Sequence, residues 1–179
     1  MRTVIAVLGL ALAGLTVAAD EPVVPKYDSE GRLVRPEVYA EWTLAGTALG
    51  LGYDEGPGGQ EVFHNVLIEP SAYHHFAETG EFRDGTMLAL LLHEVGENVM
   101  PARAGQFADG FRAFELAVKD SSREAETWKY YNFSGPQGLL PSARPFPART
   151  CHACHAEHAA RDNVFLQFYS LLRAADPAR

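Results

Sequence analysis

RDGTMLALLLHEVG, residues 83–96, begins with Asp-Gly turn chemistry and continues as an apolar run from Thr86 to Val95. Alternate residues of a strand point to opposite faces, so Leu88, Leu90 and Leu92 share one face. Met87, Ala89 and the residues that follow them at alternate positions share the other face, which is also largely apolar. A strand with two apolar faces is typical of the middle of a covered sheet, and we expect this one to be central.

The segments on either side of this run predict further strands, with helices at the ends of the sheet. Residues rich in β-branched and aromatic side chains predict strands at 60–70, 110–121 and 127–133. Apolar spacing with proline and glycine punctuation predicts helices at 35–49, 70–80 and 162–175. Gly80 is the expected C-cap of the second helix, and Asp162 or Asn163 the N-cap of the third. The pattern predicts an α+β fold, an antiparallel β-sheet with flanking helices.

The first twenty residues, MRTVIAVLGLALAGLTVAAD, predict a signal peptide rather than part of the fold. Arg2 supplies a positive start, Val4 to Val17 an apolar stretch, and VAA before Asp20 a small-residue cleavage site. A retained membrane anchor is the alternative, but the apolar run is short for a span of about 20 residues. We therefore expect a signal peptide at 1–19, an N-terminal arm at 20–35, one domain at 36–179, and a periplasmic or otherwise exported protein.

The negative net charge of the chain limits the kinds of partner that it is expected to bind. The formal net charge is −8, and loss of the signal peptide with Arg2 would make it about −9. An acidic protein is repelled by nucleic acid and by anionic membranes, so neither is expected as a partner. A basic redox partner is compatible with this charge.

RTCHACHAEHAARDN, residues 149–163, holds both cysteines and three of the seven histidines. A disulfide would close a loop of only two residues and stabilise little. A thioredoxin-like dithiol belongs in a βαβ unit, and a zinc site with His158 as fourth ligand lacks the usual separation of ligand pairs. The spacing C-x-x-C-H favours covalent haem c, with thioethers from Cys151 and Cys154 and iron bound by His155. His152 is then a bystander, as is His158.

The sixth position on the iron is left open by the sequence. Either type of side chain that binds haem iron is available: Met87 and Met100, or the histidines at 64, 74, 75 and 93. No methionine stands in a loop pattern typical of an electron carrier. We therefore expect an open distal side, with a low-spin electron carrier as a weaker alternative.

Several segments together resemble one family. NVLIEPSAYHHFAETGEFRDGT, FELAVKDS, CHACH and DNVFLQFYSLL are similar, in this order, to the cytochrome P460 family, including its cytochrome c′-beta branch. The resemblance runs from about Val38 to Leu172. It implies a β-rich homodimeric c-type cytochrome with one haem per subunit, and a haem pocket built against an antiparallel sheet by a C-terminal haem-binding helix.

The two branches of the family differ in chemistry. The P460 enzymes oxidise hydroxylamine and carry a lysine cross-linked to the haem, but the aligned residue here is Leu90, and no lysine occurs between Lys26 and Lys119. The c′-beta proteins have five-coordinate haem under a hydrophobic, often aromatic cap and bind nitric oxide and related gases. The resemblance thus implies an apolar distal wall, without hydrogen-bond donors, that admits NO or CO. Its expected members are Leu88, Leu90 and Leu92, with Phe63 as the aromatic cap.

Two charged residues complete the expected site. Glu115 matches the position of a pocket carboxylate that is proposed to handle protons in the P460 enzymes, and its alternative is a structural carboxylate within the sheet. Arg144, just before the haem motif, is a candidate partner of a haem propionate or a residue bordering the pocket, against the alternative of a solvated surface residue. The expected function is gas binding, with a P460-like oxidoreductase acting on hydroxylamine or NO through Glu115 as the alternative.

Overall fold

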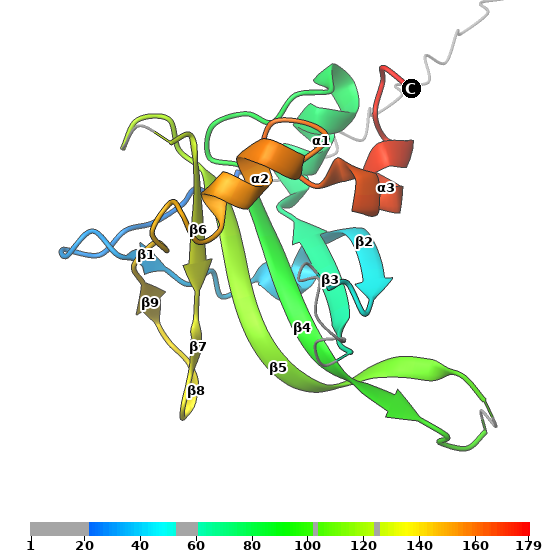
Figure 1. The fold of residues 1–179 in the computed structure, drawn as a ribbon. Coiled ribbons are helices and arrows are strands. Elements are labelled where there is room, and N and C mark those ends of the chain that lie inside the picture. Colours follow the sequence, from blue (N-terminus) through cyan, green and yellow to red (C-terminus); the bar gives the residue numbers. More distant parts are fainter. Residues whose placement is uncertain (1–21, 53–60, 102–103, 124–125) are drawn as a thin grey trace, which may run out of the picture.

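A five-stranded antiparallel sheet forms the centre of the protein in the computed structural model, which describes residues 22–52, 61–101, 104–123 and 126–179 (Figure 1). The strand order follows the sequence: β2 (Thr43–Leu49), β3 (Phe63–Ile68), β4 (Met87–Glu97), β5 (Gln106–Lys119) and β6 (Trp128–Asn132). Each strand pairs with the next along the chain, so β4 is central, as its two apolar faces predict. The predicted signal peptide at 1–19 lies outside the described residues.

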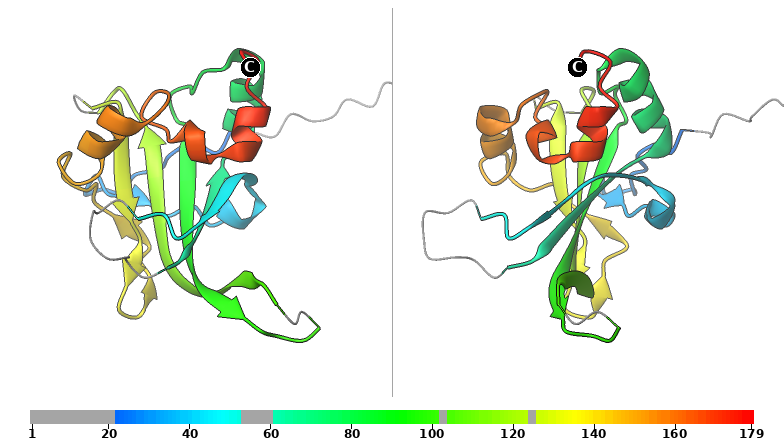
Figure 2. Two further views of the ribbon diagram at one scale, coloured as in Figure 1. Left: turned by 45° about the vertical axis from the view of Figure 1, so that its right-hand side comes forward. Right: turned by 90° about the vertical axis from the view of Figure 1, so that its right-hand side faces the viewer.

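Smaller elements surround this sheet. Two-stranded pairs join β1 (Leu33–Val34) to β9 (Ser142–Ala143) and β7 (Ser134–Gly135) to β8 (Gly138–Leu139). The α-helices are α1 (Pro70–Thr79), α2 (His152–His158) and α3 (Ser170–Ala174), and the 3-10 helices are η1 (Tyr39–Glu41) and η2 (Leu166–Phe168). Figure 2 shows α2 and α3 over one face of the sheet, with β1 on the other side. No helix among the described segments is both long and apolar enough to cross a bilayer.

The two faces of β4 belong to two separate clusters of buried side chains. Leu88 packs with α1, α3 and the segment before η2, whereas Met87 and Ala89 pack with Leu33 of β1 and the residues around it. Residues 20–35 were expected to form an extended arm. The described part of that arm is not simply extended, because the chain turns back at residues 28–32 and Tyr27 pairs antiparallel with Leu33. The segment is anchored, since Leu33 is fully buried and β1 pairs with β9.

The predicted helix at 35–49 is wrong. Only one 3-10 turn forms there, and the chain continues as β2, which pairs with β3. Gly46 and the β-branched threonines at 43 and 47 weaken a helix, and pairing with an apolar neighbouring strand overrides the helix-like spacing of the apolar residues. Tertiary pairing therefore decides this segment.

The predicted closing helix at 162–175 is only partly confirmed. A 3-10 turn and the five-residue α3 occupy it, and they are separated at Tyr169. Asp162 and Asn163 are not N-caps, because both have positive φ, at 45° and 58°, and form a tight turn bridged by Arg161 and Val164. The helix at 70–80 is confirmed, with Gly80 as C-cap in the left-handed conformation.

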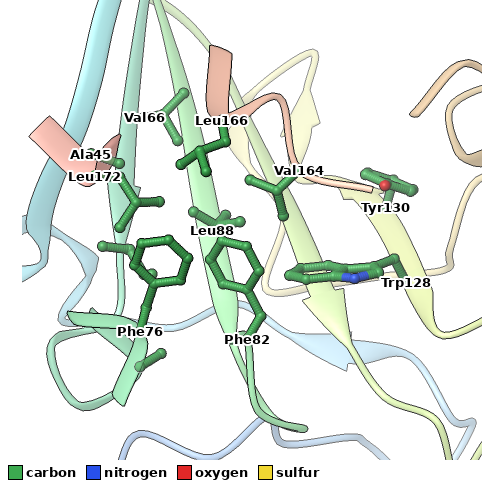
Figure 3. Close-up of a cluster of buried hydrophobic side chains, with 12 residues drawn as sticks. Ala45, Val66, Phe76, Phe82, Leu88, Trp128, Tyr130, Val164, Leu166 and Leu172 are labelled. Carbon is green, nitrogen blue, oxygen red and sulfur yellow. The ribbon is translucent and has the colours of Figure 1, made fainter. Parts of the chain in front are cut away.

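Aromatic side chains fix the end of the sheet near α1 (Figure 3). Phe76 of α1 stacks on Phe82 with ring centroids 4.7 Å apart, and Phe82 meets the edge of Trp128 at 5.9 Å. Val164 and Leu172 belong to the same buried cluster. This cluster holds the segment after α2 against the sheet, and so fixes one wall of the cavity described below.

The variant Gly46→Ala is expected to lower the free energy of unfolding by about 1–3 kcal/mol. A Cβ at this position would lie 2.7 Å from Cα of Tyr169 and 3.1 Å from the carbonyl oxygen of Phe168. These are backbone atoms, so the segment between η2 and α3 would have to move away from β2. Denaturant unfolding measures the effect, with Gly52→Ala as the control because its Cβ would meet nothing within 4 Å. Equal stability of the two variants would contradict the prediction.

Candidate functional site

A cavity of roughly 540 Å³ lies between the sheet and the segments that carry α2 and η2. Its volume falls in the range of sites that enclose a cofactor or small molecule. Its lining is mostly apolar and comes from β2, β3, β4, β5, β6, α2 and η2. Seven of the nine expected site residues line it together: Leu88, Leu90, Leu92, Glu115, Cys151, Cys154 and His155.

The two cysteines enter the cavity from the start of α2. Cys151 is the residue before the helix, and its carbonyl accepts the N–H of His155 at 3.1 Å, as helical spacing requires. Both thiols are free and half-buried. Burial raises the pKa of Cys151, and the nearby Glu115 and Cys154 add to the shift. One short helix therefore presents two thiols and one imidazole to the same space.

His155 is held in one orientation and one tautomer. Its Nδ1 lies 2.7 Å from the carbonyl oxygen of Asn163, and since a carbonyl only accepts, Nδ1 carries the proton. Tyr130 and Phe165 contact the ring, with centroids at 4.4 and 4.3 Å. Burial lowers the pKa of His155, which favours the neutral ring. The unprotonated Nε2 is then free to bind a metal, in the arrangement usual for metal-binding histidines.

The turn after α2 supplies the acceptor for this histidine. Asn163 adopts a positive φ that turns its carbonyl to His155, and its side-chain amide donates to Nε2 of His152 at 3.1 Å. His152, expected to be a bystander, is thus tied to the turn that orients His155. His158 is largely exposed and lies 3.8 Å from Glu157.

A zinc site finds no support in this arrangement. In the described part of the chain, no three side chains of His, Cys, Asp or Glu are grouped so that they could hold a metal ion. The donor set instead fits haem c, because two free thiols and an oriented imidazole border one large apolar cavity.

The sheet forms the apolar wall of the cavity. Leu88, Leu90 and Leu92 all line it from β4, together with Val66 from β3. Phe63 does not line it, because the cavity-facing residues of β3 are at even positions and Phe63 is at an odd one. The prediction of Phe63 as an aromatic cap over this cavity is therefore wrong.

Two ionisable side chains, from β3 and β5, interrupt this wall, so the expectation of a pocket without hydrogen-bond donors is also wrong. Glu115 of β5 is directly beside Leu90, and Nδ2 of Asn132 donates to it at 3.4 Å. Burial raises the pKa of Glu115. His64 of β3 is beside Leu92, and both Glu115 and His64 line the cavity.

The structure narrows the candidates for the sixth position on the iron to one. Met87 is fully buried in the cluster on the other face of the sheet, and Met100 is 71% exposed. His93 also lies on the other face, where it accepts a hydrogen bond from Asn65. The histidines of α1 do not line the cavity, which leaves His64.

Arg144 lies away from the cavity. Its side chain is 67% exposed and lies 3.4 Å from Glu30, in the segment before β1. It does not belong to the cavity lining, so the prediction that it borders the pocket is wrong. An exposed pair of this kind contributes little to stability.

Comparison with known proteins adds one finding to this geometry. A family model described as Cytochrome P460 matches residues 36–166, which is 131 of the 179 residues. The matched span contains the central sheet, the cavity wall and the CHACH motif. No curated protein matches the chain.

Proposed function

The chain belongs to the cytochrome P460 family, and from this membership we propose that it binds nitric oxide or a similar diatomic gas at a covalently attached haem. Membership of this family supports haem and iron binding, and the C-x-x-C-H motif supports attachment of that haem as haem c.

The observation that carries the proposal is the meeting of three donors and a leucine wall in one cavity. Thioether bonds from Cys151 and Cys154 would fix the haem, and His155 would bind its iron through Nε2. Bound haem would supply an iron that can take a diatomic ligand. The chain's own part is to orient His155 through the carbonyl of Asn163 and to exclude water with apolar side chains from β3 and β4.

Leu90 supports gas binding over hydroxylamine oxidation. It stands in the cavity wall where the resemblance to the P460 enzymes would place a cross-linking lysine. A leucine forms no such cross-link. An apolar wall favours gases such as NO and CO, whose binding needs little polar support.

An absorption spectrum tests this proposal directly. The ferrous holoprotein is expected to show high-spin five-coordinate haem, and stoichiometric NO is expected to convert it fully to a nitrosyl spectrum. CO should bind as well. A ferrous Soret band displaced far to the red would indicate a cross-linked chromophore and contradict the proposal, as would failure to bind NO.

A second candidate function rests on Glu115. This carboxyl is buried in the cavity wall, and its charge acts on the thiol of Cys151, so it lies near the point of haem attachment. A carboxyl with a raised pKa in such a place is suited to accept or donate a proton. The alternative is therefore an oxidoreductase acting on hydroxylamine or NO, and turnover with an artificial oxidant that is lost in Glu115→Gln would favour it.

The stability of Glu115→Gln is expected to exceed that of the native protein increasingly as the pH rises from about 4 to 7. Burial raises the pKa of Glu115 above its ordinary value of 4.5. Above pH 4.5 the native state thus binds more protons than the unfolded state, and its stability falls as pH rises through this window. Glutamine does not ionise and removes that loss. Urea unfolding across this pH range measures the difference, and a constant difference would contradict the prediction.

Export and pairing complete the proposal. The apolar stretch from Val4 to Val17 and the following small residues support a signal peptide and a periplasmic setting. Exposed apolar side chains near the tip of the β4–β5 hairpin, Phe107 and Met100 among them, support a second copy of the chain as a partner. Cell fractionation tests the location, and sedimentation equilibrium of the holoprotein tests the dimer.

A further inference from the structure

His64 is, with Glu115, one of the two ionisable side chains that line the cavity from β3 and β5, and the proposed function gives it no role. It stands on β3 between Ala48 of β2 and Leu92 of β4, and it faces the cavity. Of the seven histidines, only His64 and His155 line this space. They come from different walls, because His155 belongs to α2 and His64 to the sheet.

The imidazole of His64 lacks a well-formed polar partner. Its Nδ1 is buried and makes no hydrogen bond of ordinary geometry. Burial lowers the pKa of His64, and the backbone of Val62 opposes that shift only in part. The ring is thus favoured in its neutral form, whose single N–H is available to a cavity ligand in the tautomer that carries the proton on Nε2. Because Nδ1 is buried even though His64 lines the cavity, a ligand in the cavity can meet the ring only at Nε2.

His64 lies at some distance from Glu115, the other of these two ionisable side chains. His64 pairs with Leu92 of β4 and Glu115 pairs with Leu90, so the two lie diagonally across β4 from each other. With strands about 4.8 Å apart, their Cα atoms are about 12 Å apart. The two side chains therefore act separately, and leucines fill the wall between them.

We propose that His64 determines ligand specificity in this cavity by donating a hydrogen bond to a small ligand whose outer atom accepts one. The inference rests on the proposed function, since it needs haem in the cavity. The leucine wall alone discriminates by size and polarity, whereas one N–H in an apolar surrounding favours polar and anionic ligands over CO. The class of ligand is therefore a small hydrogen-bond acceptor, and the site is not limited to the least polar gases.

The experiment compares native holoprotein with His64→Leu, His64→Gln and His93→Leu. Cyanide is titrated against the ferric form and CO against the ferrous form, and the C–O stretching frequency is recorded. In His64→Leu the dissociation constant for cyanide is expected to rise about tenfold, the effect of one lost hydrogen bond. CO affinity should stay close to native, while the C–O frequency rises. His64→Gln keeps an N–H donor and should retain part of the cyanide affinity.

His93→Leu is the matched control, because His93 lies on the opposite face of the sheet and should leave both ligands unaffected. Native-like cyanide affinity and C–O frequency in His64→Leu would overturn the inference and leave the proposed function standing. A native spectrum that is low-spin without added ligand, and high-spin in His64→Leu, would also overturn it, by making His64 an iron ligand. Failure of the native protein to bind CO or NO would instead defeat the proposed function and the inference with it.

Discussion

The double variant Cys151→Ala/Cys154→Ala is expected to yield a protein from which acid and organic solvent remove all haem, whereas they remove none from the native protein. Both thiols are free and border the same cavity, and they are the only cysteines of the chain. No other side chain can then form a thioether with the haem. Haem-stained denaturing gels and the mass of the polypeptide measure the attachment.

Single variants separate the roles of the two thiols from the role of His155. Cys151→Ala and Cys154→Ala should each keep one thioether, so the haem should stay with the polypeptide on a denaturing gel. His155→Ala should also keep covalent haem but lose the iron's protein ligand, which changes the spectrum and leaves the mass added by the haem unchanged. His158→Ala is the control, because His158 is largely exposed and does not line the cavity. Extractable haem in the native protein would show that attachment is not covalent.

The central part of the fold could be predicted because its signals are local. The apolar residues of β4 cover both faces from Met87 to Leu92, and Gly80 marks the end of α1 by the left-handed conformation it adopts. The segment at 35–49 could not be predicted in the same way. Its apolar spacing suits a helix, and only the neighbouring β3 makes it a strand. Pairing partners that are distant in sequence carry no signal within the segment itself.

The candidate site, like the fold, has one part that local sequence predicts and one part that depends on strand pairing. The motif at 151–155 is contiguous, so both thiols and His155 could be identified from five residues. The choice between Phe63 and His64 depends on which residue of β3 faces the cavity, and a shift of one residue exchanges the two faces. To identify the cavity-facing residues of β3 from the position of Leu90, one needs the register between β3 and β4. The sequence alone does not give that register.

Asn163 is the residue of the site whose role was hardest to predict from the sequence. Its contribution is a backbone carbonyl, presented to His155 by a positive φ. Asparagine is one of the few residues other than glycine that adopts this conformation readily, so an Asp-Asn pair after the motif is compatible with a tight turn. The same pair suits a helix N-cap equally well, and only the fold distinguishes the two.

The variant Glu69→Ala is expected to lower the free energy of unfolding by about 3–5 kcal/mol. The side chain of Glu69 is buried and accepts hydrogen bonds from the backbone N–H groups of Ser71 at 2.9 Å and Ala72 at 2.8 Å, which begin α1. It also accepts from the backbone N–H of Val23 at 3.3 Å and pairs with Arg83 at 3.2 Å. One carboxylate thus joins the N-terminal segment, α1 and the turn before β4.

Removal of this carboxylate leaves its donors without partners inside the protein, which costs more than the hydrogen bonds themselves contribute. Glu69→Gln is the matched variant, because it preserves the size and one acceptor oxygen, and it should lose less than Glu69→Ala. Denaturant unfolding measures both losses. Glu69 does not line the cavity, so covalent haem and the NO spectrum should be unchanged in molecules that fold. A loss in Glu69→Ala no larger than that of an exposed substitution such as Glu81→Ala would contradict the role given to this carboxylate.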